Sequence, residues 1–538
     1  MPNDSQILDQ QPMQQGPQGE MQGQVPPQVM PMPPMPPMSR RARWNQRMMS
    51  GMAAKITSLP SWFATYAVGT YAVALLGVNI VFSNYVMEWY FWLFGIAWVL
   101  GFFFLSVHFS RKWSVLHIRR HRTFEKKLFW IGFWMRFVYA TLIFFFYKSM
   151  TGVPYEFAAA DSLSYVEIAQ DWALYMQNDR LWRELVNVAT QRGYSDMGYP
   201  LFILLPMRLF DSDFAILLTR WLNAFFGAYT TVVLYRLTHR SMNESTARMA
   251  AIFCMLHPVL ICYVGFTLKE VFMTWLVVLF IDMADRMIRS HRYSFATMAP
   301  VILVGMSLFF FRTVLGMVAF LALFVALMLM NNRIISFGKK IVLGMIIGGI
   351  LLFSVSDKIM RDVKTVTERD VVEEQRTTMV KRFGSEKEDK SYTGNSFANY
   401  AGAAVFAPLI FTIPFPTMVE AVIGQEDMRL IHGGNWMRNI MSGFVLLAMF
   451  MLLLSGDWRN YTLPLAMLLG YLLVLVFSAF AQSLRFHIPV MPFEMMFAAY
   501  AITNLRKKHK NWYLIWCAVM IIACFGWNWF KLAGRGLA

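Results

Sequence analysis

Long runs of apolar residues occur along most of the chain, and they constrain its fold more than any other feature. A helix needs about 20 residues to cross the roughly 30 Å hydrocarbon core of a bilayer. A spanning segment must be helical, because lipid offers its backbone polar groups no partner. Runs of this kind lie near residues 62–83, 88–109, 128–147, 213–236, 248–266, 269–287, 294–312, 313–331, 341–357, 437–455, 461–481, 488–504 and 511–530. The sequence therefore predicts an all-α integral membrane protein with about 13 transmembrane helices.

The composition excludes an ordinary water-soluble protein. Of the 538 residues, 57% are hydrophobic and only 15% are charged, whereas a soluble domain has about 25% charged residues. Too few polar groups are present to cover a folded surface in water, so much of the surface is expected to face lipid.

Lysine and arginine gather in alternate loops, which indicates the orientation of the chain. The largest clusters lie within 40–55, 111–127 and 506–510, and we expect them in the cytoplasm together with the N-terminus. The loops 148–198 and 358–436 then lie on the external, periplasmic face. This parity requires the stretch 400–424 not to cross, and its three prolines favour a broken, re-entrant or interfacial element. Most of the net charge of +17 comes from these clusters, which anionic lipid attracts to the membrane surface. We therefore expect no nucleic-acid partner.

Four regions are predicted along the chain. Residues 1–55 are rich in Gln, Pro and Met, without an apolar core, and indicate a disordered cytoplasmic tail. Residues 56–127 hold two N-terminal transmembrane helices and a basic loop. Residues 128–505 form the transmembrane domain that carries the external loops, and residues 506–538 form a final transmembrane helix.

The two long external loops differ in pattern. In the first, Leu163, Val166, Ala169 or Gln170, and Ala173 recur at helical spacing, which predicts an amphipathic helix lying on the membrane, with Asp161 at its start. The second, 358–398, has almost no hydrophobic pattern. It is either a mobile flap over a site or a solvated connector.

Several costly ionisable residues are expected near the outer ends of the spans, in the same leaflet as Asp161. They are Lys269, Glu270, Arg312, Arg485 and His487. A carboxylate opposite several fixed cations suits a phosphate-bearing lipid, because the cations hold the phosphate while the carboxylate activates a hydroxyl group.

Each of these residues also has a structural interpretation. Asp161 could cap the amphipathic helix, and Lys269 could pair with Glu270 or extend to the headgroups. Arg312 could keep a tight turn from sinking into lipid, and His487 could make a local hydrogen bond.

Short motifs occur in a fixed order along residues 130–505. They are Asp161-Ser-Leu-Ser-Tyr165, Gly198-Tyr-Pro-Leu-Phe202, Arg220-Trp-Leu-Asn223, His257-Pro258, Leu268-Lys269-Glu270, Phe311-Arg312 and Arg485-Phe-His-Ile-Pro489 followed by Pro492. In these motifs the chain resembles the GT-C superfamily of polytopic glycosyltransferases. It resembles especially the bacterial branch similar to protein O-mannosyltransferases and the lipid A aminoarabinose transferase.

The resemblance implies a glycosyltransferase of the cell inner membrane. It would move a sugar from a polyprenyl-phosphate carrier to a glycan, lipid or protein acceptor on the external face. Asp161 would be the base or a metal-linked catalyst. The substrate would be bound by Tyr165, Lys269, Glu270, Arg312, Arg485 and His487, with Arg485 foremost for the phosphate. Relatives commonly have paired acidic residues where this chain has Asp161 and Ser162, so a requirement for a divalent metal such as Mg or Mn stays open.

Two other functions use the same cationic face. A transporter or flippase of a lipid-linked glycan would need the cations without the chemistry, although the internal repeat common in transporters is not found. A glycan polymerase or ligase would move an oligosaccharide in place of one sugar.

Overall fold

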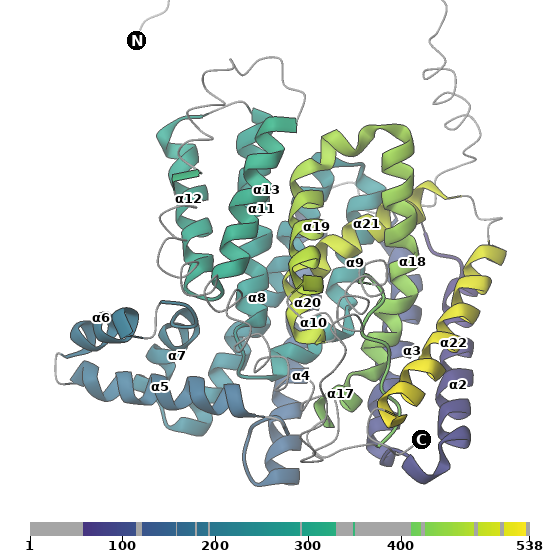
Figure 1. Ribbon diagram of the computed structural model, residues 1–538, viewed down its shortest axis with the longest axis horizontal. Coiled ribbons are helices and arrows are strands. Elements are labelled where there is room, and N and C mark those ends of the chain that lie inside the picture. Colours follow the sequence, from purple (N-terminus) through teal and green to yellow (C-terminus); the bar gives the residue numbers. More distant parts are fainter. Residues whose placement is uncertain are drawn as a thin grey trace, which may run out of the picture. The chain divides into compact units, whose positions relative to one another are not determined.

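The computed structural model describes residues 58–114, 121–157, 159–177, 180–191, 194–290, 293–329, 348–349, 410–420, 426–477, 483–505 and 510–533. All of these ranges belong to one compact unit. Every regular element within them is a helix, which confirms the predicted all-α class (Figure 1). The predicted tail 1–55 and most of the loop 358–436 lie outside these ranges.

The helices follow the apolar runs closely. In chain order they are α2 (Ser61–Val81), η1 (Ser83–Tyr85), α3 (Trp89–Lys112), α4 (His121–Thr151), α5 (Ala160–Gln177), α6 (Leu181–Gln191), α7 (Gly198–Leu209), α8 (Ser212–Ser241), α9 (Glu244–Leu256), α10 (Pro258–Cys262), η2 (Tyr263–Gly265), α11 (Glu270–Ser290), α12 (Phe295–Phe309), α13 (Thr313–Leu329), α17 (Glu426–Leu430), α18 (His432–Ser455), η3 (Asp457–Tyr461), α19 (Thr462–Phe477), α20 (Leu484–His487), η5 (Ile488–Val490), α21 (Met491–Asn504) and α22 (Lys510–Ala533).

Six helical segments in the described part of the chain are long and apolar enough to cross a membrane, so the protein is a multi-pass membrane protein. They are α2, α3, α4, α18, α22 and the continuous pair η3 and α19. A seventh is added if α9 and the helix after it, bent by 50°, form one span. The described part of the chain does not confirm the predicted number of 13. The predicted run 341–357 lies almost wholly outside the described residues, and α12, α13 and α21 have only 15, 17 and 14 residues.

Helices α3 and α18 cross at a point where neither has a side chain. A Cβ atom on Gly433 would lie 2.3 Å from the carbonyl oxygen of Gly95, so both positions need glycine. His432 fills the adjoining space, with its Nε2 3.1 Å from the Phe91 carbonyl oxygen and its Nδ1 3.3 Å from the Tyr71 hydroxyl. Close backbone approach through small residues is a common way to pack helices in lipid.

The segment 410–420 is buried up to Val419 but is not helical, as the prolines of the predicted broken element favour. Side chains of two flanking helices bind its backbone groups. Arg438 and Asn439 of α18 donate to carbonyl oxygens of residues 410–414. Asn528 of α22 accepts from the Met418 amide at 2.7 Å and donates to the Pro416 carbonyl at 3.0 Å. Irregular backbone at membrane depth is stable only when protein groups satisfy it in this way.

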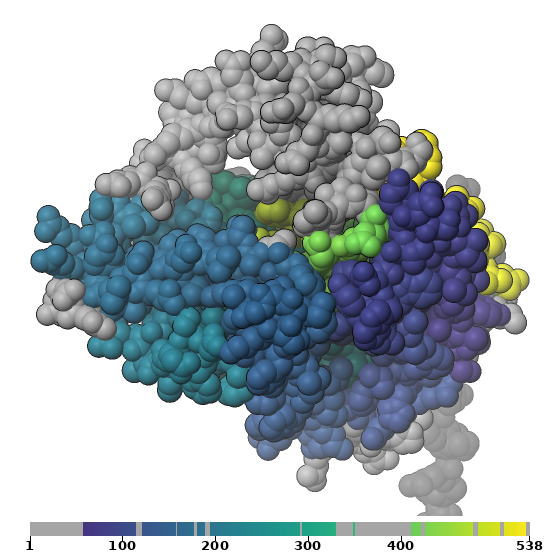
Figure 2. All heavy atoms as spheres, turned by 90° about the horizontal axis from the view of Figure 1, so that it is seen from below, coloured from purple at the N-terminus to yellow at the C-terminus, as the bar shows by residue number. Residues whose placement is uncertain are grey.

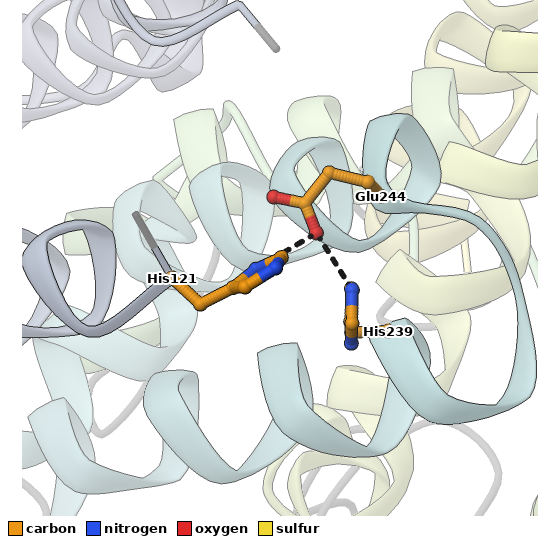
Figure 3. A group of neighbouring side chains, drawn as sticks. All are labelled: His121, His239 and Glu244. Carbon is orange, nitrogen blue, oxygen red and sulfur yellow. Dashed lines mark ion pairs between the residues drawn. The ribbon is translucent and has the colours of Figure 1, made fainter. Parts of the chain in front are cut away.

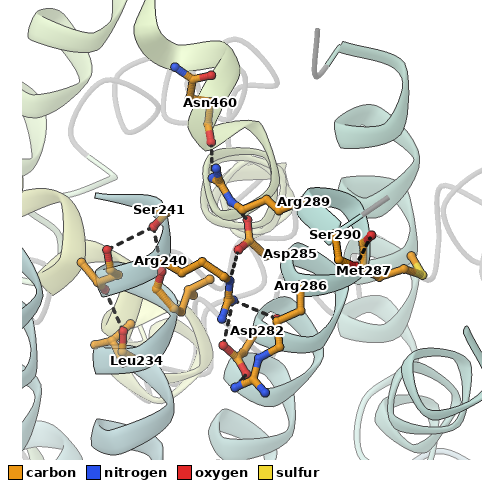
Figure 4. A network of polar contacts seen from close by, with 12 residues as sticks. Leu234, Arg240, Ser241, Asp282, Asp285, Arg286, Met287, Arg289, Ser290 and Asn460 are labelled. Atoms are coloured by element: carbon orange, nitrogen blue, oxygen red, sulfur yellow. Dashed lines mark hydrogen bonds and ion pairs between the residues drawn. The ribbon is translucent and has the colours of Figure 1, made fainter. Parts of the chain in front are cut away.

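An ionic network joins the end of α8 to α11 and η3. It consists of Arg240, Asp282, Asp285, Arg286, Arg289 and Asn460 (Figure 4). The two aspartates are each 2% exposed, and every one of their ion pairs is 2.7 to 2.9 Å long. Because of these charges, α11 as a whole is not apolar enough to count among the six membrane-crossing segments, although its N-terminal half is apolar.

The loop 148–198 contains helices α5 and α6, which lie beside α7 at one end of the bundle (Figures 1 and 2). Helix α5 is amphipathic, and the predicted residues Val166, Ala169 and Ala173 lie on its buried face together with Tyr165 and Trp172. Leu163, which we expected on this face, is 40% exposed on the other side. The aromatic residues Tyr165 and Trp172 therefore set the orientation of α5 and turn the first-turn residue Asp161 outward.

Candidate functional site

Asp161 and Arg485 form an ion pair although they are 324 residues apart in the chain. Asp161 lies in the first turn of α5, with its side chain 56% exposed, and accepts a hydrogen bond from Nη1 of Arg485. Arg485 lies on the one-turn helix α20, just before α21, and its side chain is 20% exposed. The structure thus brings together the first and last of the sequence motifs at the solvent boundary.

Glu270 lies behind this pair and contacts two arginines. Its fully buried carboxylate accepts a hydrogen bond from Nε of Arg485, and its Oε1 is 3.6 Å from Nη2 of Arg312. Arg312 also donates to the Tyr471 hydroxyl at 3.0 Å, and its guanidinium lies 4.4 Å from the centre of the Phe486 ring. Both arginines are thus fixed by neighbours on several sides.

Lys269, the residue before α11, is the third cation of the site, beside Arg485 and Arg312. Its Nζ pairs with Asp196 and donates to the Phe311 carbonyl oxygen at 2.9 Å. Burial of the ammonium group, and next the positive charge of Arg312, lower the pKa of Lys269 to about 7. Asp196 has a left-handed backbone conformation, with φ at 71°, an uncommon state for a non-glycine residue that is often found at functional sites.

The aromatic residue Tyr165 borders the same group. The Nζ atom of Lys269 lies 5.8 Å from the centre of its ring, and Tyr165 packs edge-on against Tyr199 at 5.3 Å. Asn223 of α8 donates to the Tyr199 hydroxyl at 3.3 Å. The chain of contacts from α8 through α7 to α5 holds Tyr165 next to the cations.

Glu156 is a second carboxylate that the motif analysis did not select. It is buried in the segment between α4 and α5, and it accepts a hydrogen bond from Ser162, the neighbour of Asp161. Burial raises the pKa of Glu156 to about 7. Arg220 of α8 holds this segment by donating to the Pro154 carbonyl oxygen. The only sequence signal was an acidic residue five positions before Asp161, without periodicity to indicate its burial.

His487 lies apart from the other selected residues. It is completely buried, with its Nδ1 2.9 Å from Nη2 of Arg438, which also pairs with Glu494 at 2.9 Å. His487 therefore contacts Arg438, one of the residues that hold the segment 410–420 in place.

The donor atoms around Asp161 do not form a three-ligand metal site. Within the described ranges, the only group of at least three His, Cys, Asp or Glu ligand atoms close to one another is His121, His239 and Glu244, on other elements. Asp161 and Glu270 both contact Arg485, so the positive charge between them comes from a guanidinium group. Such a group can bind the phosphate of an anionic lipid directly.

These features define a multi-pass α-helical membrane protein with an ionic site at one end of its helices. Residues 189–372 and 426–531, more than half of the chain, match the model of the Alg9-like mannosyltransferase family. The chain belongs to this family of GT-C glycosyltransferases, as the motifs predicted. It is therefore a membrane glycosyltransferase that uses a lipid-linked sugar donor.

The matched residues contain Lys269, Glu270, Arg312 and Arg485, while the match begins after Asp161 and Tyr165. Searches of curated protein sequences and of solved structures return no significant match.

Proposed function

We propose that the enzyme transfers mannose from a polyprenyl-phosphate carrier to a hydroxyl group of a glycan, lipid or protein acceptor, with Asp161 as the base. The observation that carries this proposal is the ion pair between the exposed Asp161 and Arg485, backed by Glu270, Arg312 and Lys269. Membership in a mannosyltransferase family supports mannose as the sugar. A lipid-linked donor reaches such a site laterally from the bilayer, so the chain needs no soluble nucleotide-sugar domain.

The carrier phosphate and Asp161 compete for the same guanidinium group. A donor phosphate that binds Arg485 displaces the Asp161 carboxylate, which is then free to accept the proton of the acceptor hydroxyl. The acceptor oxygen bonds to the anomeric carbon, while the bond from that carbon to the phosphate oxygen breaks. Arg485 and Arg312, with Lys269 behind them, offset the negative charge on the leaving phosphate. Binding of the donor thus releases the base.

Glu156 positions the catalytic turn in this proposal. Its hydrogen bond with Ser162 fixes the residue next to Asp161, and the contact of Arg220 with Pro154 fixes the segment that carries Glu156. Tyr165, one turn further along α5, faces the sugar side of the cationic group. His487 acts through Arg438 and the segment 410–420.

The proposed topology keeps 13 spans in the inner membrane, with the N-terminus in the cytoplasm and the Asp161 end in the periplasm. Labelling of single cysteines tests it, and the four native cysteines are all buried, which lowers the background. A cysteine replacing the exposed Ser164 of α5 should react with an impermeant reagent on intact cells. A cysteine replacing the exposed Lys126, near the start of α4, should react only after permeabilisation. The opposite pattern would invert the topology.

Transfer from radiolabelled polyprenyl-phosphate mannose to acceptors, with purified protein in lipid nanodiscs, tests the chemistry. Asp161→Asn should lower turnover by about 10²- to 10⁴-fold while donor binding is retained, because Arg485 stays in place. Asp171→Asn, which changes another exposed acidic residue of α5, is the matched control and should leave turnover unchanged.

Undiminished transfer by Asp161→Asn would remove Asp161 from the role of base. Donor binding by the wild type without turnover of any donor would favour a transporter of lipid-linked glycans.

A further inference from the structure

Two histidines and a glutamate meet at the opposite ends of the helices from Asp161. His121 begins α4, His239 lies in the last turn of α8, and Glu244 begins α9 (Figure 3). Helix α4 has 31 residues and is therefore about 46 Å long, which separates this cluster from the ionic site by the thickness of the bundle. No step of the proposed sugar transfer uses these residues.

The spacing of the three side chains suits a tetrahedral metal ion. Oε2 of Glu244 is 3.1 Å from Nε2 of His239 and 3.5 Å from Nδ1 of His121, and all three ligand atoms lie within 4.8 Å of one another. Zinc–ligand bonds of about 2.0 to 2.1 Å at tetrahedral angles place neighbouring ligand atoms about 3.4 Å apart. A zinc ion therefore fits with small shifts of side chains that are already in position.

Neighbouring groups orient the glutamate toward the histidines. Arg248 pairs with Oε1 of Glu244, so that Oε2 is the oxygen that faces both imidazole rings. The Tyr235 hydroxyl lies 3.0 Å from both carboxylate oxygens, to which it donates. It also lies 2.9 Å from Nδ1 of His121, a contact that a bound ion would replace. Outer contacts of this kind fix the geometry of metal ligands and are part of a functional metal site.

The cluster is also open to solvent. The side chains of His121 and His239 are 54% and 41% exposed, whereas that of Glu244 is 18% exposed. An ion can thus reach the imidazole nitrogens, and water can occupy a fourth position.

We propose that His121, His239 and Glu244 bind a divalent transition metal, with Zn²⁺ as the preferred ion. Two imidazoles and one carboxylate are a frequent zinc ligand set, and Mg²⁺ and Ca²⁺ prefer oxygen ligands alone. The bound ion links the start of α4 to the junction of α8 and α9. It is a structural or regulatory site on the face opposite to the one where the sugar is transferred.

Metal binding to the full-length protein, purified without a histidine tag and stripped with a chelator, tests this proposal. Titration with Zn²⁺ in nanodiscs should give one ion per chain, and Co²⁺ should show the intense visible absorption of a tetrahedral site. His121→Ala and His239→Ala should each weaken Zn²⁺ binding at least tenfold and remove the Co²⁺ absorption. Both histidines are exposed, so these variants should fold.

His108→Ala is the matched control, because His108 is an exposed histidine of α3 outside the cluster, and it should bind Zn²⁺ like the wild type. The thermal unfolding midpoint should rise with Zn²⁺ in the wild type and in His108→Ala but not in the two cluster variants. The absence of tetrahedral Co²⁺ absorption, or equal Zn²⁺ affinity in the wild type and both cluster variants, would overturn the proposal.

Discussion

The affinity for the lipid-linked donor should fall about tenfold between pH 6 and pH 8, because Lys269 loses its charge in this range. Burial and the neighbouring Arg312 lower the pKa of Lys269 to about 7. The charged fraction then drops from about 0.9 at pH 6 to about 0.1 at pH 8. If only the ammonium form holds the phosphate, the loss in binding free energy is about 1.4 kcal/mol. The donor is a phosphodiester, whose own charge does not change over this interval.

Three variants separate Lys269 from other titrating groups when the dissociation constant of the donor is measured from pH 5.5 to 8.5 in nanodiscs. Lys269→Arg should flatten the profile, because a guanidinium group stays charged throughout. Arg312→Gln should weaken binding but move the midpoint to higher pH, since the charge that lowers the pKa of Lys269 is gone. Glu156→Gln removes the other nearby group with a pKa of about 7 and should leave the slope intact.

A flat profile for the wild type would refute this reasoning. The same conclusion would follow if the slope persisted in Lys269→Arg or vanished in Glu156→Gln, because the titrating group would then not be Lys269.

Two further predictions concern stability, measured by thermal unfolding in nanodiscs. Gly433→Ala should destabilise the protein by about 2 kcal/mol or more, because the new methyl group meets the backbone of Gly95. Gly101→Ala on α3, where nothing lies within 4 Å of the added atom, should leave stability unchanged or slightly raised, and equal effects of the two would contradict the proposed close crossing. Arg438→Met should cost about 3 to 5 kcal/mol, because Glu494 is left buried without its ion pair. The double variant with Glu494→Leu should recover part of this loss, and no recovery would show that the bonds of Arg438 to the backbone dominate.

The positions of the helices follow from the sequence because crossing lipid demands about 20 apolar residues. Each crossing moves the chain to the other side of the membrane, which places the start of α11, the turn before α13 and the start of α20 at one end of the bundle. Lys269, Arg312 and Arg485 could therefore be selected together. Helix α11 shows the limit of this rule. Its C-terminal half carries charges that pair inside the bundle, and hydropathy cannot tell a paired charge from one that faces water.

The direction in which each side chain of the site points was harder to predict from the sequence than the positions of the helices. His487 follows Arg485 by two residues, and two helical steps of 100° point them to nearly opposite sides, so that one faces Asp161 and the other the core. Asp196 and Glu156 lie in irregular segments, where no periodicity reports burial. Leu163 lies outside the buried face of α5 because the rings of Tyr165 and Trp172 bury more area than Leu163 does.

The non-helical segment 410–420 has a consequence for the synthesis of the protein. Its Met418 amide bonds to Asn528, which is made 110 residues later. At translation rates of about 5 to 20 residues per second, this partner follows after about 5 to 20 s. During this interval, the polar backbone of the segment lacks its partner from α22. Helix α22 thus completes the hydrogen bonding of this segment, and a ribosome that stops before residue 528 leaves these backbone groups in the membrane without Asn528.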